Sequence, residues 1–137
     1  MERRDYFKKQ IDQLGRVLAK LLADFLALKN ASGIGEAVKS TVESLHTKLD
    51  LDLVALANIP PTDIIHTLKA VRGYSDHNLE LLADLLLAVA EENRDDRQSR
   101  KLMAHARTIF QYLETVDSTF SLERRFKIVK ITSYGID

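Results

Sequence analysis

Apolar residues in the N-terminal part of the chain recur at alternating steps of four and three, the spacing of one face of an α-helix. The pattern runs unbroken over residues 6–28. Its members are Phe7, Ile11, Leu14, Leu18, Leu21, Phe25 and Leu28. Val17, Leu22 and Leu26 widen this apolar face. We therefore expect the helix to contact two neighbours rather than one.

Small residues form a second line along the same predicted helix. Gly15, Ala19 and Ala23 are four residues apart and make a ridge with little side chain. The backbone of another helix could approach such a ridge closely. Glycine inside a helix costs about 1 kcal/mol relative to alanine, so its presence at position 15 favours this interpretation. We expect close helix packing at all three positions.

The periodicity resumes after a break and predicts a single all-α domain of five or six helices over residues 1–137. Residues 1–50 form a helical hairpin, which begins with the long N-terminal helix. Residues 51–75 form short helices, and residues 76–132 form a C-terminal helical pair plus a capping helix. The apolar residues assigned to this last helix are Leu122, Phe126, Ile128, Val129 and Ile131.

Composition agrees with a helical fold and removes several classes of function. The 137 residues include only five glycines and two prolines, and they include no cysteine. The lack of cysteine excludes a disulfide framework, thiol catalysis and cysteine-ligated zinc. The longest apolar run, residues 85–90, is far shorter than a membrane-spanning helix. With no signal-peptide pattern at its start, the chain is expected to be cytoplasmic and without membrane contact.

Charge is balanced overall but segregated along the chain. Lys plus Arg number 20 and Asp plus Glu number 20, so the net charge is zero. Residues 1–29 carry seven basic and four acidic side chains, residues 30–93 carry four and ten, and residues 94–137 carry nine and six. The middle is therefore acidic and both ends are basic. We expect the terminal helices to dock on the central helices with electrostatic help.

Two acid–histidine pairs suggest a metal site as an alternative function. Glu43 with His46, and Asp63 with His66, have the i, i+3 spacing found in di-iron helical bundles. Both members of the first pair are offset by one position from the apolar face of their helix. We therefore favour solvated flanking residues and expect no metal and no cofactor.

A basic C-terminal helix suggests a nucleic-acid-associated regulator as another alternative. Arg124, Arg125, Lys127 and Lys130 lie within seven residues. Interspersed acids and the zero net charge favour a solvated face instead, so nucleic acid is not the expected partner. The phenylalanines at positions 7, 25, 110 and 126 lie on apolar faces and favour core packing over base stacking. No nucleophile turn or phosphate-binding glycine motif is present, so no catalytic residue is assigned.

The length of the N-terminal helix predicts an interface. A helix over residues 4–29 is roughly 39 Å long, more than so small a domain can cover. The apolar face near Tyr6, Phe7 and Ile11 should therefore stay exposed, and an exposed apolar patch usually marks an interface. An antiparallel, two-fold homodimer is the expected solution. Cover by the last helix through Phe126 and Val129 is the alternative.

Several short motifs resemble a small uncharacterised bacterial family of helical proteins. They are Asp5-Tyr6-Phe7, Gln10-Ile11-Asp12-Gln13-Leu14-Gly15, Leu49-Asp50-Leu51-Asp52-Leu53, Tyr112-Leu113-Glu114 and Thr119-Phe120-Ser121-Leu122-Glu123-Arg124. Members of this family look like short tetratricopeptide-type assemblies. The resemblance implies a tetratricopeptide-like helical hairpin in the second half of the chain, and it implies no assigned activity. We therefore expect a non-catalytic protein-interaction or assembly module whose protein partner the sequence does not identify.

Overall fold

The computed structural model describes residues 2–136 and confirms an all-helical fold. The described residues contain seven α-helices rather than five or six. They are α1 (Glu2–Ala31), α2 (Ile34–Leu49), α3 (Leu53–Ala57), α4 (Ile64–His66), α5 (Asp76–Ala90), α6 (Arg97–Val116) and α7 (Leu122–Ser133). A π-helical segment, η1 (Thr67–Val71), extends α4, and a 3₁₀ turn, η2 (Glu91–Asn93), extends α5.

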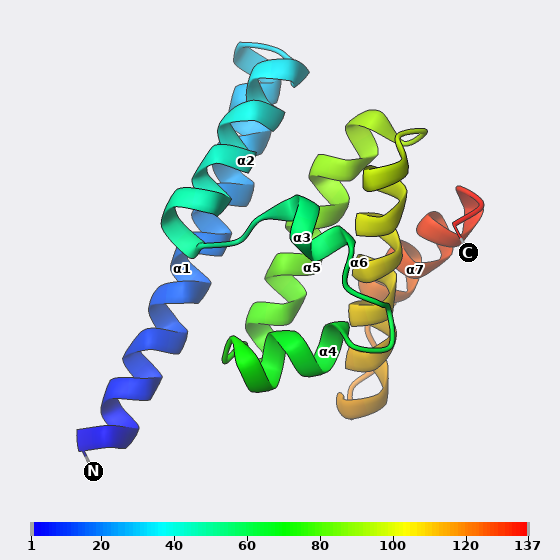
Figure 1. The fold of residues 1–137 in the computed structure, drawn as a ribbon. Helices are drawn as coiled ribbons and strands as arrows, with labels where there is room; N and C mark the ends of the chain where they lie inside the picture. Colours follow the sequence, from blue (N-terminus) through cyan, green and yellow to red (C-terminus); the bar gives the residue numbers. More distant parts are fainter. Residues whose placement is uncertain (1, 137) are drawn as a thin grey trace.

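The first two helices form a hairpin (Figure 1). Gly33 in the connection has a φ of 95°, a left-handed conformation that side chains other than glycine rarely adopt. Leu18, Leu21 and Phe25 of α1 are buried on this side. Because α2 runs only 16 residues, it covers the C-terminal half of α1 and leaves the N-terminal half projecting (Figure 1).

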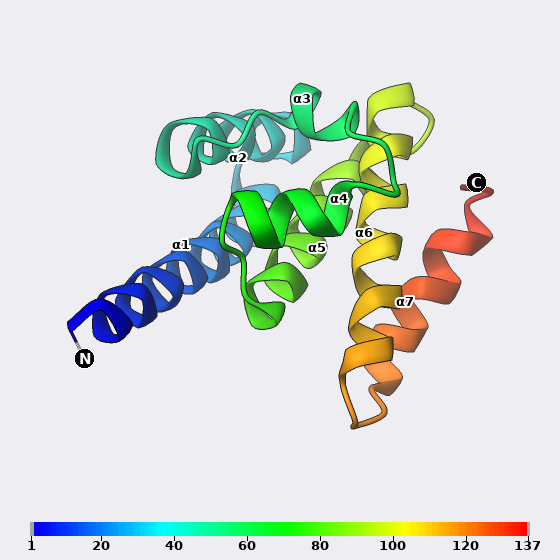
Figure 2. The same ribbon diagram turned by 60° about the horizontal axis from the view of Figure 1, so that its bottom comes forward.

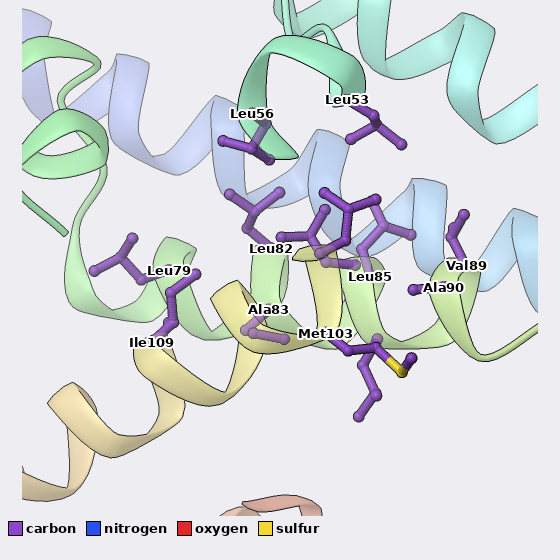
Figure 3. Packing of buried hydrophobic residues seen from close by; sticks show 14 of the residues in the cluster. Leu53, Leu56, Leu79, Leu82, Ala83, Leu85, Val89, Ala90, Met103 and Ile109 are labelled. Carbon is purple, nitrogen blue, oxygen red and sulfur yellow. The ribbon is translucent and has the colours of Figure 1, made fainter. Parts of the chain in front are cut away.

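The core lies around α5, which packs against α1 on one side and against α6 on the other. Nine of its fifteen residues are buried, in agreement with the apolar run in its sequence. The short helix α3 covers the core. Figure 3 shows Leu53 and Leu56 of α3 pointing toward Leu82 and Leu85 of α5. Asp52 begins α3 because its side chain accepts a hydrogen bond from the Val54 N–H (2.9 Å).

The segment between α4 and α5 is tied to both α5 and α6. Lys69 of η1 donates hydrogen bonds to Asp76 at the start of α5 and to the Tyr112 hydroxyl of α6 (3.0 Å). Gly73, with a φ of 74°, makes the turn into α5. Ser75 then caps α5 by accepting from the Asn78 N–H (3.2 Å). These contacts fix the turn beside the projecting half of α1.

The last helix docks with a different face from the expected one. Ile128 and Ile131 are buried against α6, whereas Phe126 and Val129 are 68% and 55% exposed. Phe126 is therefore not a core residue, and Phe7, which is 53% exposed, is not one either. Figures 1 and 2 place α7 on the far side of α6 from α1. The alternative in which Phe126 and Val129 cover the N-terminal helix is thus wrong.

The expected electrostatic docking is found for α7. Arg124 pairs with Glu80 (2.8 Å) and Lys127 with Asp84 (2.6 Å), both on α5. Lys130 pairs with Glu91 at the end of α5 (2.8 Å). The basic end of the chain is therefore held on its acidic middle by ion pairs at successive turns.

Candidate functional site

The projecting half of α1 carries the exposed apolar residues that the helix length predicted. Tyr6 is 59% exposed, Phe7 53% and Ile11 37%. Both ribbon views show this end of α1 extending away from the other helices (Figures 1 and 2). Burial begins one turn later: Leu14 is partly buried and Leu18 is completely buried. The apolar face is therefore continuous from the exposed end into the core.

A groove of about 540 Å³ runs beside this exposed end. Phe7, Ile11 and Leu14 form its α1 side, and the opposite wall is the end of η1 with the Gly73 turn. Val71 on that wall is 73% exposed. We call the groove and the exposed side chains of Tyr6, Phe7 and Ile11 the α1 surface. It offers an apolar ridge next to a hollow of mixed lining, to which Gln10 and Arg72 contribute polar groups.

The contact between Gly15 and α5 ends this projecting half. A Cβ atom at position 15 would lie 2.8 Å from the Asn78 Oδ1, closer than atoms pack. Asn78 is 1% exposed, and its Nδ2 donates to the Ile11 carbonyl oxygen (2.9 Å). The glycine thus lets a side chain of α5 reach the backbone of α1.

The rest of the predicted small-residue ridge faces solvent. Ala19 and Ala23 are both exposed, so no helix within residues 2–136 packs closely on them. The expectation of close intramolecular packing at these two positions is therefore wrong. Alanine is the strongest helix former, so a line of exposed alanines has a sufficient explanation in helix propensity.

Charges of both signs surround the α1 surface. Arg4, Asp5, Lys8, Lys9 and Asp12 are exposed. None of them belongs to an ion pair among the residues whose side chains are described. The basic residues of α7 differ, because each of its four has a carboxylate partner. The cations of α7 are thus held within the fold.

The two acid–histidine pairs lie on the surface. Glu43 and His46 are exposed on α2, and Asp63 and His66 are exposed at α4. Residues 2–136 contain no group of three or more His, Asp or Glu side chains that could hold a metal. Within the same residues no helix is long and apolar enough to cross a membrane.

A further hollow, between the loop after α3 and α6, was not foreseen from the sequence. His105 lines it and is 1% exposed. The sequence signal is the spacing of Arg97, Lys101 and His105 at steps of four on one helix face. The other wall is a loop some 45 residues away in the chain, and no local pattern predicts that it folds over α6.

The α1 surface thus combines exposed apolar side chains with surrounding charges that form no ion pair among the described side chains. Comparison with protein-family models, with curated protein sequences and with solved structures finds no match for this chain.

Proposed function

We propose that the protein is a non-catalytic interaction module that self-associates through the α1 surface. The observation that carries the proposal is the exposure of Tyr6, Phe7 and Ile11 on a helix that projects beyond its own fold. An exposed aromatic pair has a strong drive to leave water, since each aromatic side chain buries a large area on contact. A second copy of the chain is the occupant that we propose.

Two features favour a second copy. The ridge of Phe7 and the adjoining groove lie on the same surface, so two copies related by a two-fold axis can each place a ridge against the other's groove. Asp5 and Asp12 lie on the same stretch as Lys8 and Lys9. An antiparallel pair of helices brings such acids near the partner's bases, which gives the surface charge complementarity with itself.

The remainder of the fold serves as a scaffold in this proposal. The antiparallel α5–α6 pair, followed by α7, supports the inference of a tetratricopeptide-like hairpin with a capping helix. In this arrangement α7 covers α6 and leaves α1 free for its partner.

Oligomeric state tests the proposal directly. Sedimentation velocity or light scattering at micromolar concentration should give twice the mass of a single chain. Phe7→Glu combined with Ile11→Glu should shift the protein to monomer, because the charges would be buried in the interface. Phe126→Glu is the control: it places a charge on another exposed phenylalanine (68%, against 53% for Phe7), at the other end of the molecule, and should leave the dimer intact.

Two results would contradict the proposal. A wild-type protein that stays monomeric across the micromolar range rules out self-association at that strength. If Phe126→Glu disrupts the dimer and the double variant Phe7→Glu with Ile11→Glu leaves it intact, the interface lies on α7 instead of α1.

A further inference from the structure

The hollow beside His105 is bounded by residues from three parts of the chain. Its volume is about 440 Å³. The loop after α3, including Pro60, forms one wall, the first three turns of α6 form the other, and Ile136 closes one end. We call this hollow the His105 pocket. Its size lies within the range of about 300–1,000 Å³ that is typical of small-molecule sites.

His105 brings a polar group into the pocket without a partner. The side chain is 1% exposed, and neither ring nitrogen makes a hydrogen bond. Burial lowers the pKa of His105, although the nearby carbonyls of Leu56, Ala57 and Ile59 act in the opposite direction. Those carbonyls lie close to the ring but do not reach hydrogen-bond geometry. Buried polar groups in proteins nearly always have a partner, and this imidazole has none within the described residues, so a ligand that reached the ring would supply the missing hydrogen bond.

The mouth of the pocket is positively charged. Arg97, Arg100 and Lys101 line it, and none of them belongs to an ion pair among the described residues. Asp96 lies on the adjoining surface, where it caps α6 by accepting from the Ser99 N–H (3.1 Å). These three cations contrast with those of α7, all of which have carboxylate partners.

Two of the three cations are held in place by neutral acceptors. Arg100 donates to the carbonyl oxygen of Gly135 (2.7 Å), and Lys101 donates to Asn58 Oδ1 (3.2 Å). Arg97 makes no side-chain hydrogen bond within residues 2–136. The positive charge is thus positioned around the mouth, and no carboxylate among the described residues pairs with it there.

We propose that the His105 pocket binds a small phosphate monoester, with its phosphate at Arg97, Arg100 and Lys101 and a hydrogen-bonding group at His105. Three cations match a dianionic phosphate with three oxygens better than they match a singly charged carboxylate. Lys101 and His105 are one helical turn apart, which separates the two groups by roughly 6 Å along α6. The prolines and Ile136 provide an apolar wall for the part of the ligand between them.

Two matched ligands, 4-hydroxyphenyl phosphate and phenyl phosphate, test both ends of the pocket by calorimetric titration in low-salt buffer. The hydroxyl compound should bind more tightly, because only it reaches His105. Arg97→Gln and Lys101→Gln should each weaken binding of both compounds about tenfold. His105→Met should abolish the difference between the compounds and keep the affinity for phenyl phosphate. Arg16→Gln, which removes an exposed arginine outside the pocket, is the control and should change neither affinity.

The proposal is overturned if neither compound binds saturably at millimolar concentration. It is also overturned if Arg97→Gln and Lys101→Gln bind as the wild type does. Circular dichroism identifies any variant that fails to fold. If His105→Met is such a variant, the two surface substitutions still decide where the phosphate binds.

Discussion

Arg124 and Glu80 form a two-pronged ion pair that joins α7 to α5. The Arg124 Nε donates to Glu80 Oε2 (2.8 Å), and its Nη2 donates to Oε1 (2.9 Å). The Arg124 side chain is only 6% exposed, whereas Glu80 is 31% exposed. This geometry fixes the rotation of α7 about its axis, because a planar guanidinium meets a carboxylate in few orientations.

Replacing Arg124 should destabilise the fold. We expect Arg124→Ala to lower the free energy of unfolding by about 2 kcal/mol, since it leaves Glu80 partly buried without its partner. Arg125→Ala is the matched control: its pair with Glu114 spans 3.5 Å and its side chain is 55% exposed. Surface pairs contribute about 0–1 kcal/mol. Urea unfolding of both variants checks the prediction, and equal losses would contradict it.

The Gly15–Asn78 contact predicts a substitution effect that changes sign with its background. In the wild type, Gly15→Ala should destabilise the protein, because the new methyl group displaces Asn78 from the Ile11 carbonyl. In an Asn78→Ala background the same change should stabilise it by about 1 kcal/mol, the helix-propensity difference. Thermal melting of the four proteins completes this double-mutant cycle.

Ala19 provides the comparison for Gly15. Because it is exposed, Ala19→Leu should change stability by no more than about 0.5 kcal/mol. A loss of several times that amount would show that α1 packs against another helix along this line.

His105 should make the fold sensitive to mild acid. Burial lowers the pKa of its imidazole. Below pH about 6.5 the unfolded chain takes up a proton that the folded protein resists. The stabilisation from His105 is therefore fully present above that pH. It is lost as the pH falls through the lower pKa that His105 has in the folded protein. Urea unfolding between pH 7.5 and 5 should show a smaller loss in His105→Met than in the wild type, whereas the exposed-site control His46→Gln should match the wild type.

A second pH effect is expected in alkali. Hydrogen bonding to Glu91 raises the pKa of Lys130, and burial together with Glu91 raises the pKa of Tyr134. A group whose pKa is higher in the folded protein than in the unfolded chain stabilises the protein below its unfolded pKa, which is about 10 here. This stabilisation is lost as the pH rises through the folded pKa. Melting temperatures between pH 8 and 11.5 should fall less in Glu91→Gln than in Glu92→Gln, whose acid pairs with Lys29 instead.

Hydrophobic spacing predicted the long helices well but not the orientation of α7. That helix carries apolar residues on two faces: Phe126 and Val129 on one, and Ile128 and Ile131 on the other. Spacing alone cannot choose between them. Three carboxylates, two on α5 and one just beyond it, determine the orientation of α7. Only docking through Ile128 and Ile131 lets the basic residues of α7 reach these carboxylates.

The small-residue ridge and the two proposed binding surfaces also show how far local sequence spacing can predict tertiary contacts. Glycine destabilises a helix, so its presence at position 15 indicated a close contact with another helix. Alanine stabilises a helix whether it is exposed or packed, so alanine alone does not indicate such a contact. Exposure of Phe7 followed from the length of α1 relative to its cover. The His105 pocket forms because a loop distant in the sequence crosses α6. The local spacing of apolar residues does not predict this crossing.

The hydrogen bond from Asn78 to the Ile11 carbonyl has a mechanical consequence. It makes α1 a cantilever that is clamped at residues 11–15 and free over its first two to three turns. Any load applied at Tyr6 or Phe7 acts with a lever arm of roughly 6–8 Å about that clamp. The reaction force falls on the first turn of α5, the central helix of the core. Pulling on the free end should thus strain the middle of the protein before it strains α7.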